Sequence, residues 1–231
     1  MNPERADPPA QPEEMSAFFD RRVGGYERHM QGHVEAFAAF YASVAAALPD
    51  TWISPRILDL GVGTGLELEP LFARYPGACV TAVDLSRGML DALAAKDRPW
   101  SDRVMAVHGS FLEMELGSAR YDAVISAMAL HHWLPAVKAD LYGRIRRALV
   151  PGGLFVNGDF VAEKGDSARR IAAFERNRYD PRHTRHIDLP LTIEAEMHLL
   201  VEAGFERPTI PFARAAGATF VARKPDPKNP T

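Results

Sequence analysis

The sequence has almost no cysteine, no long hydrophobic run and little net charge. Cys79 is the single cysteine among 231 residues, so no internal disulfide can form. Its strand-like context, ACVTAVD, predicts a buried side chain in a reducing compartment. No apolar run approaches the roughly 20 residues that span a bilayer, and the acidic, proline-rich start differs from a secretory signal. We therefore expect a cytoplasmic protein with no membrane segment.

The charge distribution gives no reason to expect a nucleic-acid partner. The formal net charge is only −3, and a nucleic-acid-binding domain usually has a basic excess. Arg144, Arg146 and Arg147 cluster in one predicted helix, but positive charge is favoured near a helix C-terminus. With 47% hydrophobic and 25% charged residues, the composition is that of a globular protein, and the length suits one α/β domain with additions.

The first part of the chain predicts a tail followed by helices. Residues 1–13 are proline-rich and predict a disordered tail, whereas residues 14–50 predict an N-terminal helical cap. In its first helix, apolar residues recur at helical spacing, with Gly24 and Gly25 as a break or kink. These apolar residues are Phe19, Val23, Tyr26 and Met30.

Alternating strands and helices follow within residues 51–224. This order predicts a mostly parallel sheet with helices on both faces. Two final strands without a helix between them predict a C-terminal antiparallel hairpin, and residues 161–190 form a lid-like insertion. The predicted strands are 56–60, 79–84, 103–108, 121–126, 153–160, 205–212 and 218–223, and the predicted helices are 65–74, 86–96, 135–149 and 192–203.

A glycine-rich turn is the strongest local motif. The run from residue 57 to Gly65 reads ILDLGVGTG, an apolar strand that ends in Asp59 and a turn containing Gly61 and Gly63. Glycines there can adopt positive φ and let a ligand approach the backbone, at the strand ends where α/β sheets bind ligands. Asp84 ends the next strand, where a carboxylate can hold both ribose hydroxyls. The sequence therefore predicts a nucleoside site.

Three features favour S-adenosylmethionine (SAM) over a dinucleotide. Leu66 replaces the third glycine of the dinucleotide pattern. The Asp59 carboxylate would repel a pyrophosphate, but it would attract an ammonium or sulfonium group. The chain also ends in a hairpin instead of a second nucleotide-binding half.

Four segments together resemble the class I SAM-dependent methyltransferases, which have a Rossmann-like α/β fold. They are residues 57–65, VDLSRGML at 83–90, YDAVISAMALHHW at 121–133 and LVPGGLFVNGDF at 149–160. Within this class the chain is most similar to the small bacterial ubiquinone-type and carboxy-SAM-type enzymes, whose helical cap closes the active site.

The resemblance implies roles for individual residues. Ser110 stands where many relatives have an acidic residue at the adenine edge. Tyr26, Met128 and Trp133 are the expected acceptor contacts. The implied cofactor contacts are Asp59, Gly61, Gly63, Gly65, Asp84, Leu85, Met89, Ser110, Phe111 and Ser126.

His131 and His132 are the candidate catalytic residues. They follow the fourth strand, and a histidine can accept a proton near neutral pH. The alternative is that they pack the loop and orient the acceptor. Four other histidines, at 29, 33, 183 and 186, match no strong metal signature, so we expect surface histidines and no metal.

The expected reaction is methyl transfer from SAM to a small molecule, with natural-product biosynthesis as a candidate role. The Asn/Asp-Pro-Pro-aromatic motif of amide and amino-group methylation is absent, while O-, C- and other N-methylation stay open. A carboxy-SAM-type synthase, a non-catalytic SAM-binding regulator and an NAD-dependent oxidoreductase are the alternatives. For the oligomeric state, a homodimer is a candidate.

Overall fold

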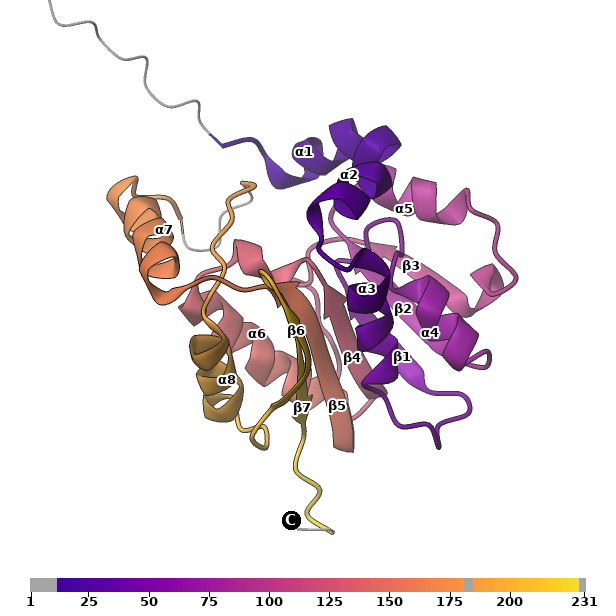
Figure 1. Cartoon of the computed structure of the whole chain (residues 1–231). Helices are drawn as coiled ribbons and strands as arrows, with labels where there is room; N and C mark the ends of the chain where they lie inside the picture. Colours follow the sequence, from indigo (N-terminus) through magenta and orange to yellow (C-terminus); the bar gives the residue numbers. More distant parts are fainter. Residues whose placement is uncertain (1–11, 181–184, 229–231) are drawn as a thin grey trace, which may run out of the picture.

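A seven-stranded sheet is the centre of the computed structural model, which describes residues 12–180 and 185–228. Figure 1 shows the sheet between two layers of helices. The strand order is β3-β2-β1-β4-β5-β7-β6. The strands are β1 (Arg56–Leu60), β2 (Cys79–Asp84), β3 (Val104–His108), β4 (Tyr121–Ala127), β5 (Leu149–Phe160), β6 (Thr209–Arg214) and β7 (Gly217–Arg223).

The sheet is parallel from β3 through β5, and β7 pairs antiparallel with both β5 and β6. The predicted α/β fold with a C-terminal antiparallel hairpin is therefore confirmed. The starts of two strands differ from the prediction by four residues each, and the other strand ends differ by at most two residues. The fifth strand begins earlier, at Leu149, because Leu149 already pairs with Tyr121 of β4. The sixth begins only at Thr209, directly after Pro208.

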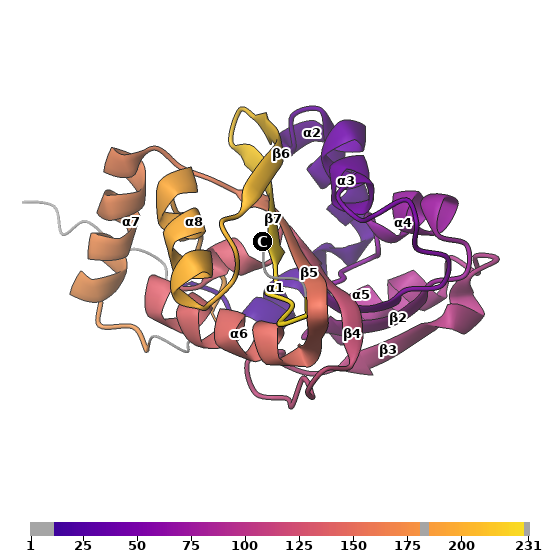
Figure 2. The same cartoon turned by 90° about the horizontal axis from the view of Figure 1, so that it is seen from below.

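Alternate residues of the strands pack on opposite helix layers. In β1, Leu58 and Leu60 join a buried cluster with α6 and α8, whereas Ile57 joins a second cluster with α3 and α4. Figure 2 shows the two layers from below. The helices of these layers are α3 (Phe37–Ala46), α4 (Leu68–Arg74), α5 (Arg87–Ala94), α6 (Pro135–Ala148) and α8 (Ile193–Glu202).

Helix starts follow local backbone chemistry. Ser86 caps α5 by accepting a hydrogen bond from the backbone N–H of Met89, as an N-cap serine does. The third helix begins at residue 37 because Ala36 has the left-handed φ of 52°. The fourth begins at residue 68, three residues later than predicted, because the glycine turn continues through Gly65, with φ of 76°.

The helical cap lies across the carboxyl end of the sheet, at the top of Figure 1. It consists of α1 (Met15–Arg22), a 3₁₀ turn at Val23–Gly25 and α2 (Tyr26–His33). The glycine pair tightens the helix into this turn, which is the predicted kink. Asp20 binds the start of α5, since its Oδ1 accepts from Ser86 Oγ at 2.5 Å and from the Gly88 N–H at 3.0 Å. The cap is therefore attached to the sheet domain by specific polar contacts.

The predicted insertion, residues 161–190, contains α7 (Lys164–Arg176) and a returning segment. His183 lies outside the described residues. The returning segment contacts the start of the chain, because Glu14 and Arg185 form an antiparallel bridge and the His186 N–H donates to the Glu13 carbonyl at 2.8 Å. The cap and the insertion thus meet over the same end of the sheet.

Cys79 is exposed, so the prediction of a buried thiol is wrong. Along β2, Val80 and Ala82 face the layer of α3 and α4, which places Cys79 on the opposite face at the start of the strand. That face has little cover toward β3, where Met105 is 54% exposed. Within the described residues, every helix is too short or too polar to cross a bilayer.

Candidate active site

The glycine turn after β1 and the end of β2 are joined by Asp84. Its Oδ2 accepts from the Gly63 N–H at 2.7 Å, and its Oδ1 accepts from the Ser86 N–H at 2.8 Å. Gly61 and Gly63 have φ of 79° and 53°, and a Cβ on Gly61 would lie 2.4 Å from the Ala129 side chain. Only glycine fits such a position without strain. The turn therefore presents bare backbone beside a carboxylate, which fits the sugar of a nucleoside.

A buried pair of carboxyl groups lies behind this turn. Asp59 and Glu67 are 0% and 3% exposed. Burial raises the pKa of Asp59 to about 7. Burial and the neighbouring Asp59 raise the pKa of Glu67 well above its ordinary value. Two adjacent carboxyl groups cannot both ionise in such a place, so the pair holds a proton at neutral pH.

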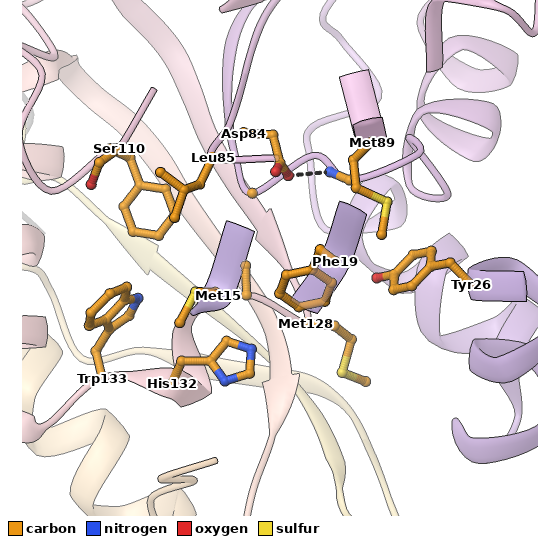
Figure 3. A pocket seen from close by; sticks show the side chains of 14 residues that line it. Met15, Phe19, Tyr26, Asp84, Leu85, Met89, Ser110, Met128, His132 and Trp133 are labelled. Atoms are coloured by element: carbon orange, nitrogen blue, oxygen red, sulfur yellow. Dashed lines mark hydrogen bonds between the residues drawn. The ribbon is translucent and has the colours of Figure 1, made fainter. Parts of the chain in front are cut away.

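The first cavity runs from the glycine turn to the fourth strand and measures about 60 Å³. Figure 3 shows Asp84 and Leu85 on one side, His132 and Trp133 on the other, and the cap residues between them. Its lining residues are Met15, Phe19, Tyr26, Gly61, Gly63, Asp84, Leu85, Met89, Ser110, Phe111, Met128, Ala129, His132 and Trp133.

Cap side chains fill part of this cavity. Met15 and Phe19 of α1 point between Asp84 and His132 in Figure 3, and Met15 is only 6% exposed. Small-molecule sites usually measure roughly 300 Å³ or more. The side chains of α1 therefore occupy space that a nucleoside cofactor would need.

A second cavity of about 500 Å³ adjoins the first. The two share a wall made by Phe19, Tyr26, Met128 and His132. The remaining wall of the second cavity mixes aromatic, basic and acidic side chains. These are Phe18, Arg21, Arg22, Gly24, Gly25, His29, Met30, His131, Phe160, His186 and Asp188.

His131 is held by a buried aspartate from β5. Its Nδ1 donates to Asp159 Oδ1 at 2.6 Å, and both side chains are at most 5% exposed. Burial alone would raise the pKa of Asp159, yet the facing His131 and the nearby Lys138 lower it. Asp159 is thus a carboxylate that fixes the His131 ring, whose other nitrogen, Nε2, is directed toward Asp188 at 3.6 Å.

His132 lies in a different environment. Its Nδ1 is 3.2 Å from Asp188 Oδ1 and 3.2 Å from the Ile187 carbonyl oxygen. Burial and the adjacent His131 lower the pKa of His132 to about 4, although Asp188 opposes the shift. His132 is therefore neutral at physiological pH and a weak base, which leaves His131 as the better candidate for proton transfer.

Most of the residues expected from the sequence meet at the two cavities. Asp59, Gly65 and Ser126 do not line either one: Asp59 lies behind the turn, and the Ser126 hydroxyl donates to the Leu60 carbonyl at 2.7 Å. Met15, Asp159 and Asp188 belong to the site but were not predicted.

Comparisons with known proteins agree with this geometry. A family model described as a methyltransferase domain matches residues 57–153. A malonyl-[acyl-carrier protein] O-methyltransferase of Priestia megaterium is 34% identical over 109 residues, 45% of this chain and 38% of that protein. A demethylmenaquinone methyltransferase of Clavibacter sepedonicus is 31% identical over 170 residues, 72% of this chain and 66% of that protein.

The fold also matches a solved structure over nearly its whole length. The structure of DhpI in complex with SAH, S-adenosylhomocysteine, has a TM-score of 0.71 at 19% identity and covers 93% of this chain and 96% of that one. At this identity the likeness concerns the fold alone. Together with the sequence matches and the nucleoside-fitting turn, it shows that the chain belongs to the class I SAM-dependent methyltransferases, with SAM as the cofactor.

Proposed function

We propose that the protein transfers the methyl group of SAM to an oxygen atom of a small-molecule acceptor that binds in the second cavity. The observation that carries the proposal is the shared wall between the two cavities, with the His131–Asp159 pair beside it. A cofactor in the first cavity and an acceptor in the second would meet at Met128 and His132. One protein similar to this chain, the malonyl-[acyl-carrier protein] O-methyltransferase, is named for methylation of an oxygen atom.

SAM supplies a methyl group on a positive sulfur, and its transfer to an oxygen leaves S-adenosylhomocysteine. The protein aligns the acceptor oxygen behind that methyl group, and such positioning can contribute about 7–11 kcal/mol. Asp84 and the bare turn hold the sugar, while Tyr26 and Met128 separate cofactor from acceptor. Asp159 accepts the Nδ1–H of His131 and fixes the ring, so that Nε2 is the His131 nitrogen directed toward the acceptor cavity. This nitrogen can take the proton itself or bind an ion that acidifies the hydroxyl.

The cavity wall also describes the acceptor. Phe18, Phe19 and Phe160 offer aromatic surface, and His29 and His186 offer polar contacts. This lining suits a ring compound with a free hydroxyl or carboxyl group. Such compounds are typical of natural-product biosynthesis, which we propose as the setting.

A panel of hydroxylated and carboxylated ring compounds, incubated with methyl-labelled SAM, tests the proposal. We expect label in one class of O-methylated product. In His131→Asn, kcat should fall by about 10²–10⁴ with little change in SAM affinity. His198→Asn is the matched control, because His198 is an exposed residue of α8 that pairs with Glu202, outside both cavities. Label on carbon or nitrogen alone, or a modified cofactor in place of a product, would contradict O-methylation.

A further inference from the structure

Three side chains of types that can bind a metal ion meet in the wall of the second cavity. His131, His132 and Asp188 each offer one ligand atom, and these atoms lie within 4.8 Å of one another. The two histidines are adjacent in a 3₁₀ turn after β4, while Asp188 comes from the segment that returns from the insertion. Sequence spacing does not indicate this cluster, because some 55 residues separate the histidines from the aspartate.

The distances match the geometry of metal ligands. Asp188 Oδ1 is 3.2 Å from His132 Nδ1 and 3.6 Å from His131 Nε2. Ligand atoms at about 2.0–2.1 Å from a tetrahedral metal ion are themselves about 3.3 Å apart. Small side-chain rotations would therefore bring all three atoms onto one ion.

Asp159 completes the pattern of a metal site. Histidine ligands usually donate their second ring N–H to a carboxylate or carbonyl, which orients the ring and strengthens the ligand. His131 does so to the buried Asp159 at 2.6 Å. The ligand face is open on one side, because the Asp188 side chain is 46% exposed and all three residues line the cavity.

We propose that His131, His132 and Asp188 bind one divalent transition-metal ion, with an open coordination position that holds the acceptor oxygen. Two imidazoles and one carboxylate are typical ligands of zinc, cobalt or iron(II), whereas magnesium and calcium prefer oxygen ligands. The inference rests on the proposed function for the identity of the acceptor. With the ion bound, His131 Nε2 is a ligand, the hydroxyl becomes acidic on the metal, and its proton leaves to water.

Cobalt(II) is a suitable probe because the full chain can be titrated and followed by its visible absorption. Protein treated with a chelator and then dialysed should bind one equivalent of Co²⁺, with Zn²⁺ displacing it. Asp188→Asn and His132→Asn should each weaken binding at least tenfold. Asp159→Asn should weaken it by about 10- to 100-fold through the orientation of His131.

The control is the double variant His33→Asn with His198→Asn. Both side chains are exposed, and His33 stacks on His29 at 3.8 Å, so its replacement also breaks the surface histidine pair that could bind metal adventitiously. Their replacement should leave Co²⁺ binding unchanged. Loss of binding in this variant, with wild-type affinity in Asp188→Asn, would overturn the site, as would the lack of stoichiometric binding in the parent.

The same preparations separate this inference from the proposed function. Metal-free protein should still bind SAM by calorimetry, while its methyl transfer should fall at least tenfold and return with Zn²⁺ or Co²⁺. Full O-methylation by metal-free protein would overturn the role of the ion and leave the proposed function intact. If the protein loaded with metal methylates no oxygen of any acceptor in the panel, that result would count against the proposed function itself.

Discussion

Replacing Asp84 with asparagine should weaken cofactor binding by about 10- to 100-fold. Each carboxylate oxygen of Asp84 accepts one backbone N–H, from Gly63 at 2.7 Å and from Ser86 at 2.8 Å. An asparagine keeps one acceptor but turns an amide NH₂ toward the other backbone donor. A hydrogen bond from a ribose hydroxyl to the Asp84 carboxylate would contribute about 1.5–3 kcal/mol, and each 1.4 kcal/mol is about tenfold in affinity.

Calorimetry with S-adenosylhomocysteine measures this effect directly. The dissociation constant should rise, while kcat at saturating SAM should change by less than about threefold, because Asp84 lies on the sugar side of the cavity. Asp122→Asn is the matched control, since Asp122 also accepts a backbone N–H, from Arg56 at 2.8 Å, but at the opposite end of the sheet. An unchanged dissociation constant in Asp84→Asn, or an equal rise in the control, would refute the assignment.

Three further perturbations follow from buried groups. Lys138→Met should lower the free energy of unfolding by about 3–5 kcal/mol in urea titrations, because the buried Glu196 loses its partner at 2.8 Å; adding Glu196→Leu should recover much of the loss. Gly61→Ala should weaken SAM binding at least tenfold by calorimetry, because the new Cβ would lie 2.4 Å from the Ala129 side chain. Wild-type affinity in this variant would show that the turn can shift to accommodate the methyl group, which would contradict the prediction. Stability should fall as pH rises from about 4 through 7, since the pKa of Asp59, raised by burial to about 7, makes the folded state bind more protons than the unfolded state. Asp59→Asn should flatten that slope in urea titrations at several pH values.

The elements that carry the expected cofactor residues could be predicted from the sequence because their signals are local. Strand β1, the glycine turn and Asp84 follow one another within 30 residues, and each carries a recognisable pattern. The apolar periodicity likewise placed the sheet and the kinked cap. Element ends shifted by a few residues, as where Gly65 still belongs to the turn and α4 begins at Leu68.

The acceptor side depends on contacts between distant segments. Asp159 meets His131 because β5 lies beside β4, and Asp188 arrives on the return from an insertion without periodic pattern. Phe19 was assigned to the apolar face of a helix, and no sequence signal distinguishes a side chain that packs from one that fills a cavity. The expectation of no metal rested on sequence spacing alone, and the cluster on which we base the metal proposal comes from residues far apart in the sequence.

Cofactor binding by the full chain is the most direct test of the central claim. Isothermal titration calorimetry with SAM and with S-adenosylhomocysteine should show saturable binding at one ligand per chain, and NAD should give no binding heat. Clear binding of NAD, with no heat from SAM or S-adenosylhomocysteine, would contradict the account.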